Sequence, residues 1–248
     1  MEIKADKIIQ IINKKDFSRH DILMAATREH TSFKESDMKN LLEKLLTNRS
    51  IVRVSRNLYR RNEDVNITSV YEPVYSEESR KLIRGIQQEY PLLKFQVWEL
   101  SWFNEFLMHL VAQNVIFLDV ENDGCEFVYS SFSDSYKGKM LLRPTSKELQ
   151  YYSKGDGIIV ERLVSESPKG KNHAYETPLE KLVVELFANK SLRELISQGD
   201  FAYILETVFE KYHVDQTKMF RYARRRNKQD ELARYIKEHT GILLSGGV

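Results

Sequence analysis

Residues 38–61 read MKNLLEKLLTNRSIVRVSRNLYRR, and this stretch decides the fold of the first quarter of the chain. Its apolar residues recur at positions i, i+3, i+4, i+7 and i+8, which predicts a helix with an inner face of Met38, Leu41, Leu42, Leu45 and Leu46. Two β-prone runs then flank Ser55-Arg56-Asn57, a turn in which Asn57 can adopt the left-handed conformation. The stretch therefore predicts a helix followed by a β-hairpin.

Two more helices are predicted upstream. Clustered isoleucines predict a helix over about residues 2–13, and Ser18 with Asp21 predicts the capped start of a second. Ser32 and Glu35 form an S-x-x-E capping box for the third helix. Three helices and a hairpin follow the winged helix-turn-helix order, so we expect such a domain in residues 1–62, with its third helix in the DNA major groove.

Basic and amide side chains lie on the predicted outer faces of this domain. On the third helix, Lys39, Asn40 and Lys44 suit base edges. In the hairpin, the valines, Leu58 and Tyr59 are expected to face inward. The remaining side chains are expected to face outward and contact DNA phosphates: Arg53, Arg56, Asn57, Arg60 and Arg61. Two alternatives stay open, a helical subdomain whose hairpin binds protein and an ordinary solvated surface.

Charge is unevenly distributed along the 248 residues, although the net charge is only +2. Residues 1–62 carry 14 Lys+Arg against 8 Asp+Glu, residues 63–212 carry 16 against 24, and residues 213–248 carry 8 against 4. A basic front end is typical of a segment that binds a polyanion, and the acidic middle suits a different partner.

Composition excludes several protein classes. Hydrophobic residues make up 42% and charged residues 30%, as in globular proteins that fold in water. The single cysteine, Cys125, excludes a disulfide framework and a thiolate metal cluster. No apolar run approaches the roughly 18 residues of a membrane helix, and residues 1–4 do not resemble a secretory signal. We therefore expect a cytoplasmic protein.

After a connection at 63–74, the chain alternates between predicted helices and strands. Helices are predicted near 77–90, 103–111, 124–132 and 145–152, and strands near 95–100, 115–120, 139–142 and 157–162. Thr177-Pro178-Leu179-Glu180 predicts a capped helix start, with further helices near 199–212, 216–226 and 228–239. The expected fold is α+β: a winged helix-turn-helix, then a mixed α/β domain over 75–248 that ends in a helical subdomain.

The middle of the chain offers little support for catalysis. Asp119, Glu121 and Asp123 alternate after a strand, but the lysine that a D…E-x-K nuclease places two residues after its glutamate is missing. The histidines lack metal-ligand spacing, and there is no phosphate-binding glycine loop. We expect Cys125, Trp98 and Trp102 to be buried and His109 to be structural within its helix. We expect no enzyme activity, no metal and no cofactor; a metal-dependent nuclease is kept as an alternative.

A second basic cluster occurs near the end of the chain. In the helix predicted at 216–226, Phe220 and Ala223 face inward and leave arginines on the open side: Arg221, Arg224 and Arg225, followed by Arg226. These side chains either compensate the helix dipole or contact a second polyanion site.

The chain resembles the AbiEi-like antitoxins of bacterial type IV toxin–antitoxin systems. The resemblance is carried by Ile51–Tyr59, Val97-Trp98, 103–106 and 117–121, and most specifically by 177–185 and 219–226. The family hairpin usually has glycine where this chain has Asn57.

The resemblance implies a protein that binds inverted repeats in its own promoter, represses its operon and counters a cognate nucleotidyltransferase toxin through its C-terminal domain. It leaves open whether the toxin is contacted directly. No coiled-coil seam is evident, so we expect a monomer that pairs on DNA. A stand-alone regulator with a ligand-sensing C-terminal domain is the other alternative.

Overall fold

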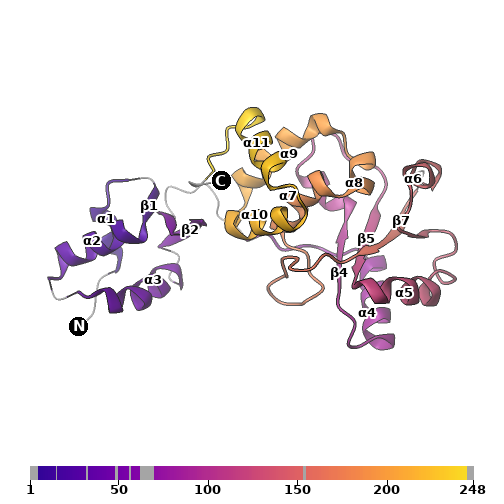
Figure 1. Ribbon diagram of the computed structural model, residues 1–248, viewed down its shortest axis with the longest axis horizontal. Helices are drawn as coiled ribbons and strands as arrows, with labels where there is room; N and C mark the ends of the chain where they lie inside the picture. Colours follow the sequence, from indigo (N-terminus) through magenta and orange to yellow (C-terminus); the bar gives the residue numbers. More distant parts are fainter. Residues whose placement is uncertain are drawn as a thin grey trace. The chain divides into compact units, whose positions relative to one another are not determined.

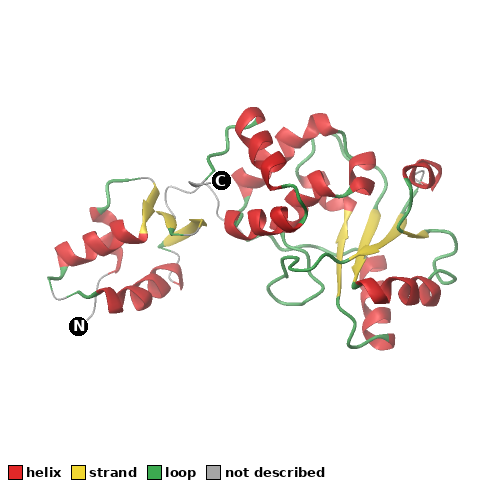
Figure 2. Cartoon of the chain, viewed as in Figure 1, coloured by secondary structure: helices red, strands yellow, loops and turns green. Residues whose placement is uncertain are grey.

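The computed structural model describes residues 5–14, 16–31, 33–47, 50–55, 57–61, 70–152 and 155–244. The chain divides into two compact units. The first holds the described residues up to Val70 together with Phe209–Thr217 and Leu244, and the larger one holds Tyr71–Val208 and Lys218–Leu243. Helices and two separate sheets confirm the predicted α+β class (Figure 2). No helix in the described ranges is both long and apolar enough to cross a membrane.

Up to Arg61, the first unit contains three α-helices, one short 3₁₀ helix and a three-stranded antiparallel sheet (Figure 1). The elements are α1 (Ala5–Ile11), β1 (Asp16–Ser18), α2 (Arg19–Glu29), the short 3₁₀ helix η1 (Glu35–Asp37), α3 (Met38–Thr47), β2 (Ile51–Ser55) and β3 (Leu58–Arg61). The sheet order is β1-β3-β2. The helix and hairpin predicted from residues 38–61 are therefore confirmed, and β1 is an additional strand that the sequence pattern does not predict.

One apolar core joins these elements. It contains the inner face predicted for α3, Met38, Leu41 and Leu45, and it excludes Leu46, which is 37% exposed. At the start of α2 the predicted cap is confirmed, because Asp21 donates its backbone N–H to Ser18 Oγ at 3.2 Å and its carboxylate accepts the Ser18 N–H at 2.8 Å. The capping box predicted between Ser32 and Glu35 involves a residue outside the described ranges; η1 instead follows Lys34, whose N–H donates to Asp37.

The larger unit is built around a four-stranded mixed sheet. It begins with α4 (Glu77–Glu89), β4 (Phe95–Glu99), η2 (Leu100–Glu105), β5 (Val115–Val120), η3 (Asn122–Gly124), α5 (Cys125–Phe132), β6 (Met140–Leu142), α6 (Ser146–Tyr152) and β7 (Gly157–Arg162). The helices that follow are α7 (Leu179–Ala188), α8 (Lys190–Leu195), η4 (Gln198–Asp200), α9 (Phe201–Lys211), α10 (Gln216–Arg225) and α11 (Gln229–His239). The sheet order is β4-β5-β7-β6, with β4 antiparallel to β5 and the other pairs parallel.

Both faces of this sheet are covered. Helices α4 and α5 lie on one side of the sheet (Figure 1). Alternate residues of β4, β5 and β7 pack with these helices in one apolar cluster, which includes Val97, Leu118 and Val160. The residues between them point to the opposite face, because successive side chains of a strand alternate. There they meet α7, whose Lys181 bonds to β4 and β5.

Two predictions of helix extent and capping in the larger unit are wrong. The helix expected over 103–111 is only the 3₁₀ helix η2, and His109 and Leu110 lie in an exposed loop. That loop is held by Asn104, whose side chain accepts the Val111 N–H at 2.7 Å. Thr177 does not cap α7: its buried Oγ1 has no hydrogen-bond partner among the described residues, and Pro178 occupies the cap position.

Candidate functional site

The outer face of α3 is polar and basic. Lys39, Asn40 and Lys44 are exposed, whereas Met38 and Leu41 of the same helix are buried. This division follows from the 3.6-residue period, which turns one stripe of the helix into the core and the opposite stripe toward solvent. The three residues predicted to contact base edges are therefore accessible for that role.

The hairpin differs from the prediction in its two last arginines. The turn is confirmed, since Asn57 has the left-handed φ of 67°. Arg60 does not face outward unpaired: its guanidinium contacts Asp16 of β1 with Nε–Oδ1 and Nη2–Oδ2 distances of 2.5 and 2.9 Å. Arg61 donates to the carbonyl of Ile12. Both arginines therefore hold the unit together.

The remaining hairpin arginines are only partly described. The backbone of Arg53 belongs to β2, but its side chain and the whole of Arg56 lie outside the described residues. Their predicted contacts with phosphate stay predictions.

The arginines of the second basic cluster divide into two groups. Arg221, Arg224 and Arg225 are exposed on α10, and the latter two donate to Gln229 (2.7 Å) and Ser165 (2.6 Å). Arg226 was predicted among the surface contacts, and this is wrong. Its guanidinium is mostly buried and lies 2.9 Å from the carboxylate of Glu185 in α7.

A row of polar side chains crosses the sheet beneath α7. Gln96 of β4 is paired in register with Asp119 of β5, which is paired with Glu161 of β7. We call these three residues the polar row. Because paired residues on neighbouring strands point to the same face, all three face the helices that cover this side. Such a row inside a protein must be fully hydrogen-bonded to be stable.

Lys181 of α7 joins two members of the polar row. Its Nζ lies 2.5 Å from Asp119 Oδ2 and 2.7 Å from Gln96 Oε1, and its side chain is 1% exposed. The indole N–H of Trp98 donates to the same Asp119 oxygen at 3.0 Å. The Asp119 carboxylate is thus buried, and a cation and an indole both donate to its Oδ2 atom.

Glu161 and Glu185 extend this buried network. Glu161 accepts hydrogen bonds from Asn189 (2.7 Å) and Ser191 (2.8 Å). Burial, followed by the nearby Asp119 charge, raises its pKa to about 7. One turn after Lys181, burial also raises the pKa of Glu185, which accepts from Tyr222 and Arg226.

The carboxylates predicted as a possible metal site do not converge. Asp119 faces α7, Glu121 accepts the backbone N–H of Lys94 at 3.2 Å, and Asp123 is exposed in η3. Within the described ranges, no group of three or more His, Cys, Asp or Glu side chains is placed to hold a metal ion. Cys125, Trp98 and Trp102 are buried, as predicted, and burial raises the pKa of the Cys125 thiol.

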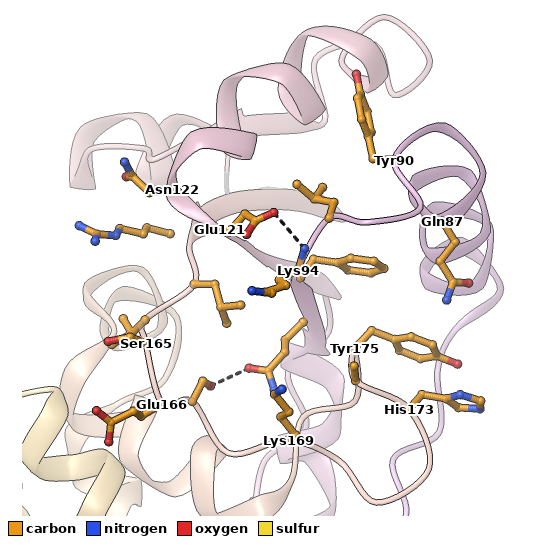
Figure 3. A pocket seen from close by; sticks show the side chains of 18 of the residues that line it. Gln87, Tyr90, Lys94, Glu121, Asn122, Ser165, Glu166, Lys169, His173 and Tyr175 are labelled. Carbon is orange, nitrogen blue, oxygen red and sulfur yellow. Dashed lines mark hydrogen bonds between the residues drawn. The ribbon is translucent and has the colours of Figure 1, made fainter.

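A cavity of about 660 Å³ opens at one edge of the sheet (Figure 3). Its lining comes from the residues before β4, the ends of β5 and β7, and the loop over 163–175. Lys94, Arg162 and Lys169 contribute positive charge, and Tyr175 and His173 contribute aromatic rings. No sequence pattern predicts this cavity, because its residues come from three separate segments of the chain, within 87–96, 121–122 and 162–175.

A model of a protein family described as "Family of unknown function (DUF6577)" matches residues 37–242. The match begins just before α3 and ends just after α11, so it includes the exposed face of α3, the polar row and the cavity. No curated protein matches the sequence.

Proposed function

We propose that this chain, which belongs to the DUF6577 family, is a DNA-binding repressor of its own operon and the antitoxin of a type IV toxin–antitoxin pair. The first unit would bind inverted repeats in promoter DNA. The larger unit would counter a nucleotidyltransferase toxin, directly or indirectly, as in the antitoxins that the sequence resembles.

The arrangement of the first unit supports a winged helix-turn-helix. Helices α1, α2 and α3 precede the β2–β3 hairpin, and β1 lies between α1 and α2 and pairs with β3. In this interpretation α3 is the recognition helix and the hairpin is the wing. The net charge of residues 1–62, with 14 Lys+Arg against 8 Asp+Glu, agrees with a polyanion partner.

The observation that carries the proposal is the exposed face of α3. Lys39, Asn40 and Lys44 are exposed on a helix whose Met38, Leu41 and Leu45 are buried in the core, so these three polar side chains are outside the core packing. Lysine and asparagine donate to base edges and phosphates in a major groove. The contact set excludes Arg60 and Arg61, because both are held inside the unit.

Salt dependence of DNA binding tests this assignment. Replacing Lys39 or Lys44 with alanine in the full chain should weaken binding to the upstream promoter DNA. If the lysine contacts a phosphate, the slope of log K against log salt should become shallower by about one. The measurement is fluorescence anisotropy over a range of salt concentrations.

Lys7 provides a matched control, since it is an exposed lysine on α1. Lys7→Ala removes the same charge and should leave the slope nearly unchanged. Equal effects of Lys7→Ala and the two α3 variants would show that binding follows net charge alone and would remove α3 from the interface.

The antitoxin role is tested by growth. Co-expression with the product of the neighbouring gene should restore growth that this product alone inhibits. The Lys39→Ala, Lys44→Ala double variant should lose repression and keep the rescue, because rescue is assigned to the larger unit. A lack of rescue by the unaltered chain would exclude the antitoxin role while leaving DNA binding intact.

The exposed arginines of α10 provide a second contact, with DNA or the toxin. Arg221, Arg224 and Arg225 are accessible, whereas Arg226 is committed to Glu185. We assign the second contact to the first three and exclude Arg226.

A further inference from the structure

The cavity of the larger unit lies where open α/β sheets commonly bind ligands. Strands β5 and β7 are parallel, and both of their carboxyl ends reach it, at Glu121 and at Arg162–Leu163. Crevices outside the carboxyl ends of parallel strands are frequent binding sites, because the loops that leave them diverge. At about 660 Å³ the cavity is within the usual size range of small-molecule sites, roughly 300–1,000 Å³.

One wall of the cavity is a stack of aromatic rings. Tyr175 is stacked with Phe95, with an interplanar angle of 12°, and with His173, at 7°. His173 is exposed, so its outer face is available to a further planar ring (Figure 3).

The loop that carries these rings is fixed before any ligand binds. The backbone N–H of Val97 donates to the Tyr175 carbonyl, and Gly170 donates to the carbonyl of Glu176. A Cβ atom at Gly170 would lie 2.1 Å from the Cβ of Glu176, so only glycine permits this close approach. A preformed wall lowers the entropic cost of binding.

Three cations line the same space. Within the described part of the chain, the side chains of Lys94, Arg162 and Lys169 have no hydrogen bond or ion pair to the protein. The lining residues include two carboxylates, Glu121 and Glu166. This local excess of positive charge occurs in a segment, 63–212, where carboxylates outnumber Lys and Arg by 24 to 16. Unpaired cations in a concave site favour an anionic ligand.

We propose that this cavity binds a nucleotide-class ligand, that is, a small molecule that joins a planar heteroaromatic ring to a phosphate. The ring stacks on His173, and the phosphate lies among Lys94, Arg162 and Lys169. The site is independent of the DNA-binding proposal, since it lies wholly in the larger unit. If both hold, the chain is a regulator whose larger unit senses a small ligand.

Isothermal titration calorimetry on the full chain tests this site with the four ribonucleoside monophosphates, adenosine and inorganic phosphate as probes. We expect at least one monophosphate to bind one to one and more tightly than adenosine or phosphate. Alanine at Lys94, Arg162 or Lys169 should weaken that binding about tenfold or more, as for the loss of a charge-assisted hydrogen bond. His173→Ala should weaken nucleotide binding and leave inorganic phosphate unaffected.

Two lysines serve as controls. Lys171 belongs to the same loop and does not line the cavity, and Lys39 belongs to the DNA-binding face, so alanine at either should keep nucleotide affinity unchanged. All altered side chains are exposed, and unchanged thermal unfolding will verify folding. Absence of binding at millimolar concentration, binding that survives all three cavity substitutions, or nucleotide affinity no higher than that of phosphate would overturn the proposal.

Discussion

Replacing Lys181 with methionine should lower the free energy of unfolding of the larger unit by about 3–5 kcal/mol, the usual cost of removing one partner of a buried ion pair. Methionine is similar in length and apolar, so the packing volume changes little. The Asp119 carboxylate, however, would stay buried beside α7 without its cation, and Gln96 Oε1 would lose a charged donor. Stability is lost because buried polar groups are left without a partner, and not because a cavity forms.

Tryptophan fluorescence during urea unfolding measures this effect. The chain has two tryptophans, Trp98 and Trp102, and both belong to the larger unit, so the signal reports its unfolding separately. Lys190→Met, at an exposed position of α8, is the matched control and should stay within about 0.5 kcal/mol of the unaltered chain.

A second substitution separates charge from packing. Adding Asp119→Asn to Lys181→Met removes the unpaired charge and keeps an acceptor for the Trp98 indole, so the double variant should be more stable than Lys181→Met alone. A loss below about 1 kcal/mol for Lys181→Met, or no recovery in the double variant, would show that Lys181 does not stabilise the fold by compensating the buried Asp119 charge.

Most elements of the larger unit are predictable from the sequence because their signals are local. The strands at 115–120 and 157–162 are apolar runs of ordinary length, and α4 has the period of an amphipathic helix that ends before Pro91. Strand β1 has only three residues, too few to show the alternation of polar and apolar side chains. It forms by pairing with the edge of β3, which is distant in sequence. Helix α8 is also short, although Asn189, whose side chain accepts the Leu192 N–H, is a recognisable cap.

The directions of individual arginines are harder to predict. Arg60 and Arg61 are adjacent on a strand, so the pleat alone prevents both from facing the same side. Their partners, Asp16 and Ile12, are more than 40 residues away, and nothing in the local sequence identifies them. Arg226 is similar, because its partner Glu185 lies on another helix.

The polar row cannot be predicted from sequence patterns either, because its members are far apart in the sequence. Gln96, Asp119 and Glu161 become neighbours only through strand order and register. One signal is available on α7, where Glu180, Lys181 and Glu185 interrupt an otherwise apolar helix, with Lys181 and Glu185 one turn apart. Charged residues in a helix that is hydrophobic on all sides indicate buried partners elsewhere in the fold.

The second large effect concerns pH, and it arises from Glu161. In the folded protein its pKa is raised from 4.5 to about 7, with burial as the main cause. Between these two values the folded state holds a proton that the unfolded state has released, so stability decreases as pH rises. The contribution is fully present below about pH 4.5 and is lost as pH rises through 7, a change of about 3 kcal/mol.

Glu161→Gln isolates this contribution. Glutamine cannot ionise, and it can still accept from Asn189 and bond to Ser191, so the network keeps its shape. We expect the variant to gain stability relative to the unaltered chain as pH increases from about 5 to about 8, by most of that roughly 3 kcal/mol. Urea unfolding followed by tryptophan fluorescence at each pH provides the measurement.

The difference in unfolding free energy between Glu161→Gln and the unaltered chain excludes the effects of other titrating groups. Glu185 also has a raised pKa, but it is present in both proteins and cancels in the difference. Glu126→Gln, at an exposed position of α5, should show no such pH-dependent gain. A constant difference across the pH range would mean that Glu161 is ionised throughout. In that case its two hydrogen bonds outweigh burial, and the polar row would carry two carboxylates against the single cation of Lys181.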